Sequence, residues 1–198
     1  MLNEFPGVDF YEFERYTAEL QQLGFVWQTD YRTQTSKVGH PTGIARVMLH
    51  PDRRCFVEIA QLNNRGKDLR VHCSIMSYAL RQHNGGTDTV WMLSTTNREI
   101  LSTAFALRHS WSYGNSMPGA GPVQLLESHL SRRRQIINES GVDVSTDISC
   151  KTYFGLIQDR IESRRKMLKK ANILLFLLRA DLFKLKPRSE WSGTPAGG

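Results

Sequence analysis

The chain has 198 residues, 40% hydrophobic and 23% charged, which excludes a disordered polypeptide and favours one globular domain with an appendage. Its three cysteines, Cys55, Cys73 and Cys150, are odd in number and widely spaced, which argues against a disulfide framework. The formal net charge of +7 is uneven, because residues 1–150 carry 15 basic and 15 acidic side chains while residues 151–198 carry 11 and 4. A neutral body with a basic arm points to an anionic surface or to a protein partner.

The N-terminus lacks the basic and apolar regions of a secretory signal. No stretch of the chain approaches the ~18 consecutive apolar residues that a membrane-spanning helix needs. We therefore expect a cytoplasmic protein with no signal peptide and no transmembrane helix, with peripheral membrane attachment as an open alternative.

Apolar residues recur every three or four positions from Asp9 to Leu23, which predicts a helix that Gly24 ends. Strand-like runs follow, and we expect them to form an antiparallel meander of about five strands: residues 25–33, 44–49, 55–62, 69–80 and 89–96. The pattern of residues 100–107 fits a helix or a strand. Residues 110–121 are rich in glycine and proline, which predicts a loop.

The clearest hairpin joins residues 44–49 to residues 55–62 across a turn that contains Pro51 and Asp52. If the strands meet across a five-residue loop, Arg46 faces Glu58 and Val47 faces Val57. One face of the hairpin is then wholly apolar, and the other carries a cross-strand ion pair. This register is our prediction for the centre of the sheet.

Two helices are predicted after the sheet. Pro122 suits the first turn of a helix over residues 122–140, and Gly141 ends it. Asp147 or Ser149 caps a second helix, which continues without a breaker to Lys186. The sequence thus predicts an α+β fold in three parts: a globular domain over residues 1–148, a long basic amphipathic helix over 149–187, and a disordered tail over 188–198.

Ten positions of the long helix from Phe154 to Leu185 are spaced alternately by three and four residues, and nine of them are apolar. Its apolar half completes the core, enters a membrane interface, or binds a protein partner or a second copy of the chain; the pattern leaves these three open. The predicted membrane- or partner-binding residues are Arg160, Arg164, Arg165, Lys166, Lys169, Lys170, Leu174, Phe176, Leu177 and Phe183.

A second candidate surface is the non-core face of the meander. It would bring together Arg46, Glu58, Arg70 and His72 beside large apolar side chains, as a ligand-binding face does. The alternative is an ordinary Arg46–Glu58 ion pair on a face that a helix covers.

Specific signatures of catalysis are missing from the sequence. The six histidines form no metal-ligand spacing, and no nucleophile elbow is present. The glycine-rich residues 114–121 precede a helix but lack the Lys-Ser/Thr of a phosphate-binding loop. We therefore predict no catalytic residues, no metal and no cofactor.

Three short segments, residues 45–51 with 58–61, residues 93–97 and residues 126–130, resemble a group of uncharacterised bacterial proteins. The resemblance covers roughly residues 10–140. It implies an α+β domain, linked in some members to membranes, and it assigns no functional residues.

From these observations we expect a non-enzymatic accessory protein that docks through its basic helix on a membrane surface or in a larger protein assembly. An enzyme or small-ligand-binding domain that uses Arg46, Glu58 and His72 is the alternative. Nucleic-acid binding is third, because only Tyr153 and Phe154 place aromatic rings near the basic residues.

Overall fold

The computed structural model describes residues 8–33, 43–62, 70–84, 86–99, 107–170 and 189–193. In chain order its elements are α1 (Phe10–Gln22), β1 (Val26–Thr33), β2 (Gly43–His50), β3 (Cys55–Leu62), β4 (His72–His83), β5 (Gly86–Thr96), β6 (Ser112–Ser116), α3 (Pro122–Ser140), α4 (Cys150–Lys170) and β7 (Glu190–Trp191). The predicted α+β class with a mostly antiparallel sheet is confirmed. Residues 100–107, whose conformation the pattern left open, lie outside the described residues except for Leu107.

The sheet has seven strands in sequence order, so the predicted five-stranded sheet is too small. Neighbours from β1 to β5 pair antiparallel, β6 then joins β5 in parallel, and β7 pairs antiparallel with β6. Strand β6 falls within residues 110–121, where we expected a loop, and β7 falls within the predicted disordered tail. The loop prediction was wrong because β6 is only five residues long and mostly polar. The tail prediction was wrong at the two residues of β7, and residues 194–198 lie outside the described residues.

Close packing between Gly114 and Trp191 explains why β7 joins the sheet. Gly114 faces Trp191 across the β6–β7 pair, and a Cβ atom at Gly114 would overlap the indole ring. The absence of a side chain therefore makes room for the ring. A hydrogen bond of 2.7 Å from the Ser116 amide to the Ser189 carbonyl begins the same pairing.

We expect Gly114→Ala to detach β7 and to lower the free energy of unfolding by about 1–2 kcal/mol, the usual effect of overfilling a packed site. Urea denaturation followed by tryptophan fluorescence measures this change. Gly155→Ala is the matched control, because no atom would lie within 4 Å of a Cβ at that helical position. Equal stability of Gly114→Ala and the wild type would show that β7 needs no close approach.

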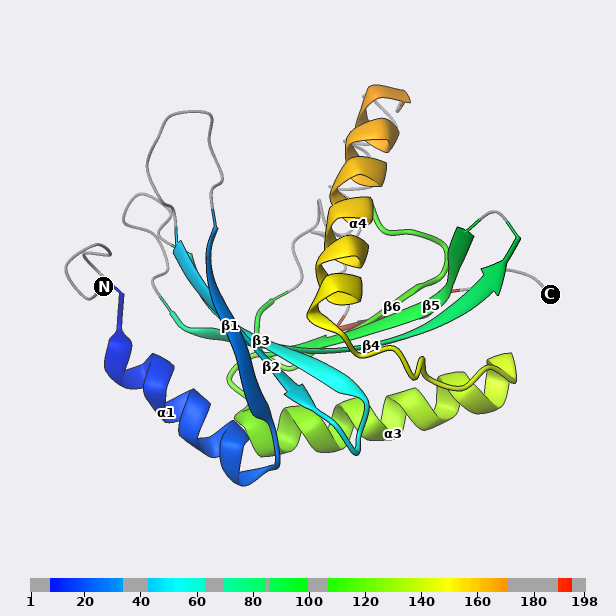
Figure 1. Ribbon diagram of the computed structural model, residues 1–198. Helices are drawn as coiled ribbons and strands as arrows, with labels where there is room; N and C mark the ends of the chain where they lie inside the picture. The colour runs from blue at the N-terminus through cyan, green and yellow to red at the C-terminus, as the bar shows by residue number, and fades with distance from the viewer. Residues whose placement is uncertain are drawn as a thin grey trace.

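Helices cover both faces of the sheet (Figure 1). Helices α1 and α3 lie on one face, where their buried side chains join those of β2, β3 and β4. Helix α4 lies on the opposite face, where Tyr153 and Leu156 pack against Val47, Phe56 and Met76. The central strands are therefore buried on both sides, and neither face is left as a purely polar surface.

The β2–β3 register differs by one residue from our prediction. Arg46 faces Ile59, and Glu58 faces Val47, because the connecting turn has four residues rather than five. Arg54 closes the shorter turn with a φ of 48°, a left-handed conformation that the sequence did not indicate. Alternation along the strands cannot select between the two registers when both faces are buried.

Helix α4 begins as predicted, with the Thr152 amide donating to the Ser149 side chain at 3.2 Å. Its described part ends at Lys170, so the predicted continuation to Lys186 lies outside the described residues. The same holds for four of the predicted binding residues, Leu174, Phe176, Leu177 and Phe183, and for the side chain of Lys170.

Candidate functional site

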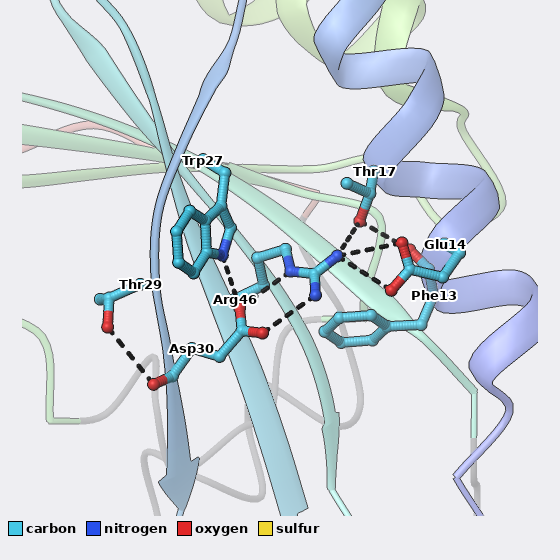
Figure 2. Close-up of polar contacts among 7 residues, drawn as sticks. All are labelled: Phe13, Glu14, Thr17, Trp27, Thr29, Asp30 and Arg46. Carbon is cyan, nitrogen blue, oxygen red and sulfur yellow. Dashed lines mark hydrogen bonds and ion pairs between the residues drawn. The ribbon is translucent and has the colours of Figure 1, made fainter. Parts of the chain in front are cut away.

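Arg46 joins helix α1 to the first two strands of the sheet (Figure 2). Its Nε and Nη2 atoms donate to the two carboxylate oxygens of Asp30 at 2.8 and 2.9 Å. Its Nη1 atom donates to Glu14 at 3.0 and 3.1 Å and to the Thr17 hydroxyl at 3.0 Å. The Asp30 hydrogen bonds raise the pKa of Arg46, so the guanidinium stays charged.

All three guanidinium nitrogens of Arg46 thus donate hydrogen bonds to residues of the same chain. The guanidinium also lies over the Phe13 ring, 5.1 Å from its centroid. Arg46 therefore has a structural role as a bridge between α1, β1 and β2. It lies on the α1 face of the sheet, and the predicted pairing with Glu58 does not form.

Glu58 lies on the opposite face, beneath helix α4. Its Oε2 atom accepts a hydrogen bond from the Tyr153 hydroxyl at 2.8 Å and a second, short one from the Tyr31 hydroxyl. Burial, followed by the negative charge of Glu58, raises the pKa of Tyr31 well above its ordinary value. Both phenols therefore remain protonated donors at neutral pH, and the carboxylate fixes α4 to β1 and β3.

Arg70 and His72, the other two residues of the predicted ligand face, line a cavity of about 1030 Å³ near the start of β4. Asn97 also lines it, and its side chain is held by the Cys73 amide and the Tyr16 hydroxyl, each at 2.9 Å. Acidic and basic side chains share the lining, which gives no clear preference for one charge of ligand. The ligand role of Arg70 and His72 stays a prediction.

The described basic residues of α4 divide into two groups. Arg165, Lys166 and Lys169 are exposed, whereas Arg160 and Arg164 are half-buried. The apolar seam that the sequence predicted is also only partly covered, because Ile161 is 39% and Leu168 is 47% exposed. Helix α4 rises from the sheet, and its C-terminal turns extend away from the strands (Figure 1).

A buried histidine that the sequence did not single out lies on the α3 face. The His129 ring is fully buried, with Nε2 2.9 Å from the Ser77 hydroxyl and Nδ1 3.0 Å from the Thr95 hydroxyl. Burial lowers the pKa of His129 to about 3, which leaves the ring neutral. A Ser–His contact of this kind has no access to substrate, so its role is structural.

The two buried cysteine thiols and the metal-ligating side chains of the described residues form no reactive site. Burial raises the pKa of the Cys55 thiol to about 12, and that of Cys73 also rises. Over the described ranges, no cluster of three or more histidine, cysteine or acidic side chains could hold a metal ion. These residues therefore give no indication of a nucleophile or a metal centre.

The sequence assigned no role around the charged groups of the α4 face to Tyr31 or His109, and it named Tyr153 only as an aromatic neighbour of the basic residues. Tyr31 alternates on β1 with Asp30, which points to the α1 face, but only the pairing with β2 shows that Tyr31 shares a face with Glu58. Tyr153 lies one position before the predicted seam residue Phe154. If the apolar pattern of the helix had been read one residue earlier, it would have placed Tyr153 on the side of α4 that contacts the sheet.

No helix within the described ranges has the length and apolarity needed to cross a membrane. Comparisons with protein-family models, curated proteins and solved structures find no match to this chain. They therefore give no support to the resemblance of residues 10–140 to bacterial proteins, and the functional argument depends on the geometry alone.

Proposed function

We propose that this chain is a non-enzymatic binding protein that docks through helix α4 on an anionic membrane surface. The observation that carries the proposal is the division of α4 into two parts. Its first turns are fixed to the sheet by Tyr153 and Leu156. Its last turns extend from the body (Figure 1), and they carry exposed basic and apolar side chains.

Charge complementarity favours an anionic surface. The described part of α4 carries seven basic residues, Lys151, Arg160, Arg164, Arg165, Lys166, Lys169 and Lys170, against the acidic Asp159 and Glu162. Each basic residue near an anionic lipid surface contributes on the order of 1 kcal/mol to binding. Arg165, Lys166 and Lys169 together would supply about 3 kcal/mol on the same basis, a reversible and salt-sensitive attachment.

The exposed apolar residues supply the second component. Ile161 and Leu168 are seven residues apart, so they lie on one side of the helix, two turns from each other. Apolar side chains flanked by lysine and arginine are typical of helices that lie in a membrane interface.

We expect the full chain to float with vesicles that contain phosphatidylserine and to remain unbound with phosphatidylcholine alone. High salt should weaken the flotation, because the Debye length shortens to about 3 Å at 1 M salt. The double variant Lys166→Glu/Lys169→Glu should abolish it. Density-gradient flotation of the intact protein measures all three results.

The control variant makes the same change in net charge at two positions outside α4. Arg53→Glu/Arg134→Glu alters two exposed arginines near the α3 face and should float like the wild type. Equal loss in both variants would show that net charge alone attracts the protein. Failure of the wild type to float would overturn membrane docking and would favour a protein assembly, to be sought by measuring the oligomeric size.

A further inference from the structure

The half-buried arginines of α4 form a cluster that docking on a flat surface does not explain. Arg160 and Arg164 are one helical turn apart on the side of α4 that faces the sheet. His109, from the segment before β6, is close enough for both arginines to affect it electrostatically. Its ring stacks on Trp111, with 4.5 Å between centroids and an interplanar angle of 3°.

Two nitrogens of this cluster lack a hydrogen-bond partner among the described residues. Within the described part of the chain, the Arg164 Nε and His109 Nε2 atoms are buried and make no hydrogen bond. No carboxylate forms an ion pair with Arg160 or Arg164 there. A half-buried donor without an acceptor is unfavourable by about 1–3 kcal/mol, and a charged one by more.

The charges of the cluster are also unbalanced. Burial, with the charge of neighbouring Arg164, lowers the pKa of Arg160 to about 10, and burial lowers the pKa of Arg164 in the same direction. Glu58 attracts Arg160, but its described hydrogen bonds come from Tyr31 and Tyr153. Glu58 thus offsets the charge of Arg160, whereas burial alone shifts the pKa of Arg164 among the described residues, so a surplus positive charge remains.

We propose that Arg160, Arg164 and His109 form a discrete binding site for a phosphate-type oxyanion. Guanidinium groups donate two parallel hydrogen bonds to phosphate oxygens, which would satisfy the unpartnered nitrogens and balance the charge. The ligand is a free phosphate, a phosphorylated small molecule or a lipid phosphate headgroup, since all three present the same oxygens. The site is separate from the exposed docking residues and does not depend on membrane docking.

Titration calorimetry of the full chain with inorganic phosphate, at constant ionic strength, tests the site. We expect saturable binding of one phosphate per chain. Arg164→Gln should weaken it by about tenfold or more, since a charge-assisted bidentate contact is lost. Arg134→Gln removes the same charge from an exposed position on α3 and should leave the affinity within twofold of the wild type.

A parallel arm separates a lipid source from a soluble one. Vesicles with phosphatidic acid, whose headgroup is a phosphate monoester, are compared with phosphatidylserine vesicles of equal charge. Preference for phosphatidic acid that Arg164→Gln abolishes supports the site with a lipid ligand. Phosphate binding without any flotation supports the site and overturns membrane docking.

Two results would overturn the anion site. The first is the absence of saturable phosphate binding together with no preference for phosphatidic acid. The second is equal weakening by Arg164→Gln and Arg134→Gln, which would indicate diffuse electrostatics. Circular dichroism confirms that each variant is folded, and Arg160→Gln provides a second removal of a site residue.

Discussion

Replacing Glu58 by alanine is expected to lower the free energy of unfolding by about 3 kcal/mol, because two partly buried hydroxyls lose their acceptor at about 1–3 kcal/mol each. These are the hydroxyls of Tyr31 and Tyr153. Arg160 loses its attractive charge in the same step. Helix α4 should then separate from the sheet before the rest of the fold.

Urea denaturation followed by circular dichroism measures the loss, and limited trypsin cleavage within α4 reports its release. Tyr153→Phe is the graded comparison, since it removes one hydrogen bond and keeps the packed ring, for about 1 kcal/mol. The ring contributes independently, with its centroid 4.9 Å from that of Phe56. A Glu58→Ala protein as stable as Tyr153→Phe would contradict the anchoring role of the carboxylate.

The second large effect is a pH dependence centred on His129. Its pKa of about 3 in the folded protein lies below the value near 6.5 of an unfolded chain. The unfolded state therefore binds the proton first, and stability is lost as the pH falls below about 6.5. Between pH 7.5 and pH 5 the loss from this group approaches 2 kcal/mol, at up to about 1.4 kcal/mol per pH unit.

Denaturation curves at these two pH values measure the effect, and the window stays above the range in which unfolded carboxylates titrate. His129→Leu should reduce the dependence, and burial of His50 and His109, which also lowers their pKa values, accounts for the remainder. The variant should also destabilise the protein by about 2 kcal/mol at pH 7.5, because the Ser77 and Thr95 hydroxyls lose a buried partner.

Two further variants test whether the effect comes from the buried hydrogen bonds of His129. The triple variant His129→Leu/Ser77→Ala/Thr95→Val should recover part of the loss, since removing both sides of a buried hydrogen bond is nearly neutral. His83→Leu, at an exposed position, should change stability at pH 7.5 by less than about 0.5 kcal/mol. An undiminished pH dependence in His129→Leu would assign it to other groups.

Capping residues and glycine stops in the sequence predicted the bounds of the two helices of the globular body, α1 and α3, to within one or two residues. The expected helix from Asp9 to Leu23 is observed as Phe10–Gln22, with the Asp9 side chain accepting from the Glu12 amide at 3.0 Å. The helix over residues 122–140 has its predicted bounds, and Gly141 ends it with a φ of 67°. Capping and glycine stops act within one turn, so they can be recognised in a single segment.

The candidate sites are formed by contacts between residues that lie far apart in the sequence, which local patterns do not reveal. The sequence named Arg160 and Arg164 but could not divide them from Arg165 and its exposed neighbours. It named Arg46 and Glu58 as a pair, whereas the structure assigns them to opposite faces. The one-residue difference in the β2–β3 register produced this error, and every side chain of a strand changes face with such a shift.

The sequence by itself determined the α+β class, the two helices of the body, the start of α4 and the concentration of positive charge in the last quarter of the chain. These follow from periodicity, caps and composition, which are local properties. Only the tertiary structure decided the register, the addition of β6 and β7, and which charged groups meet. Those features arise between residues far apart in sequence, where both sheet faces are buried and the pattern of apolar residues no longer distinguishes one pairing from another.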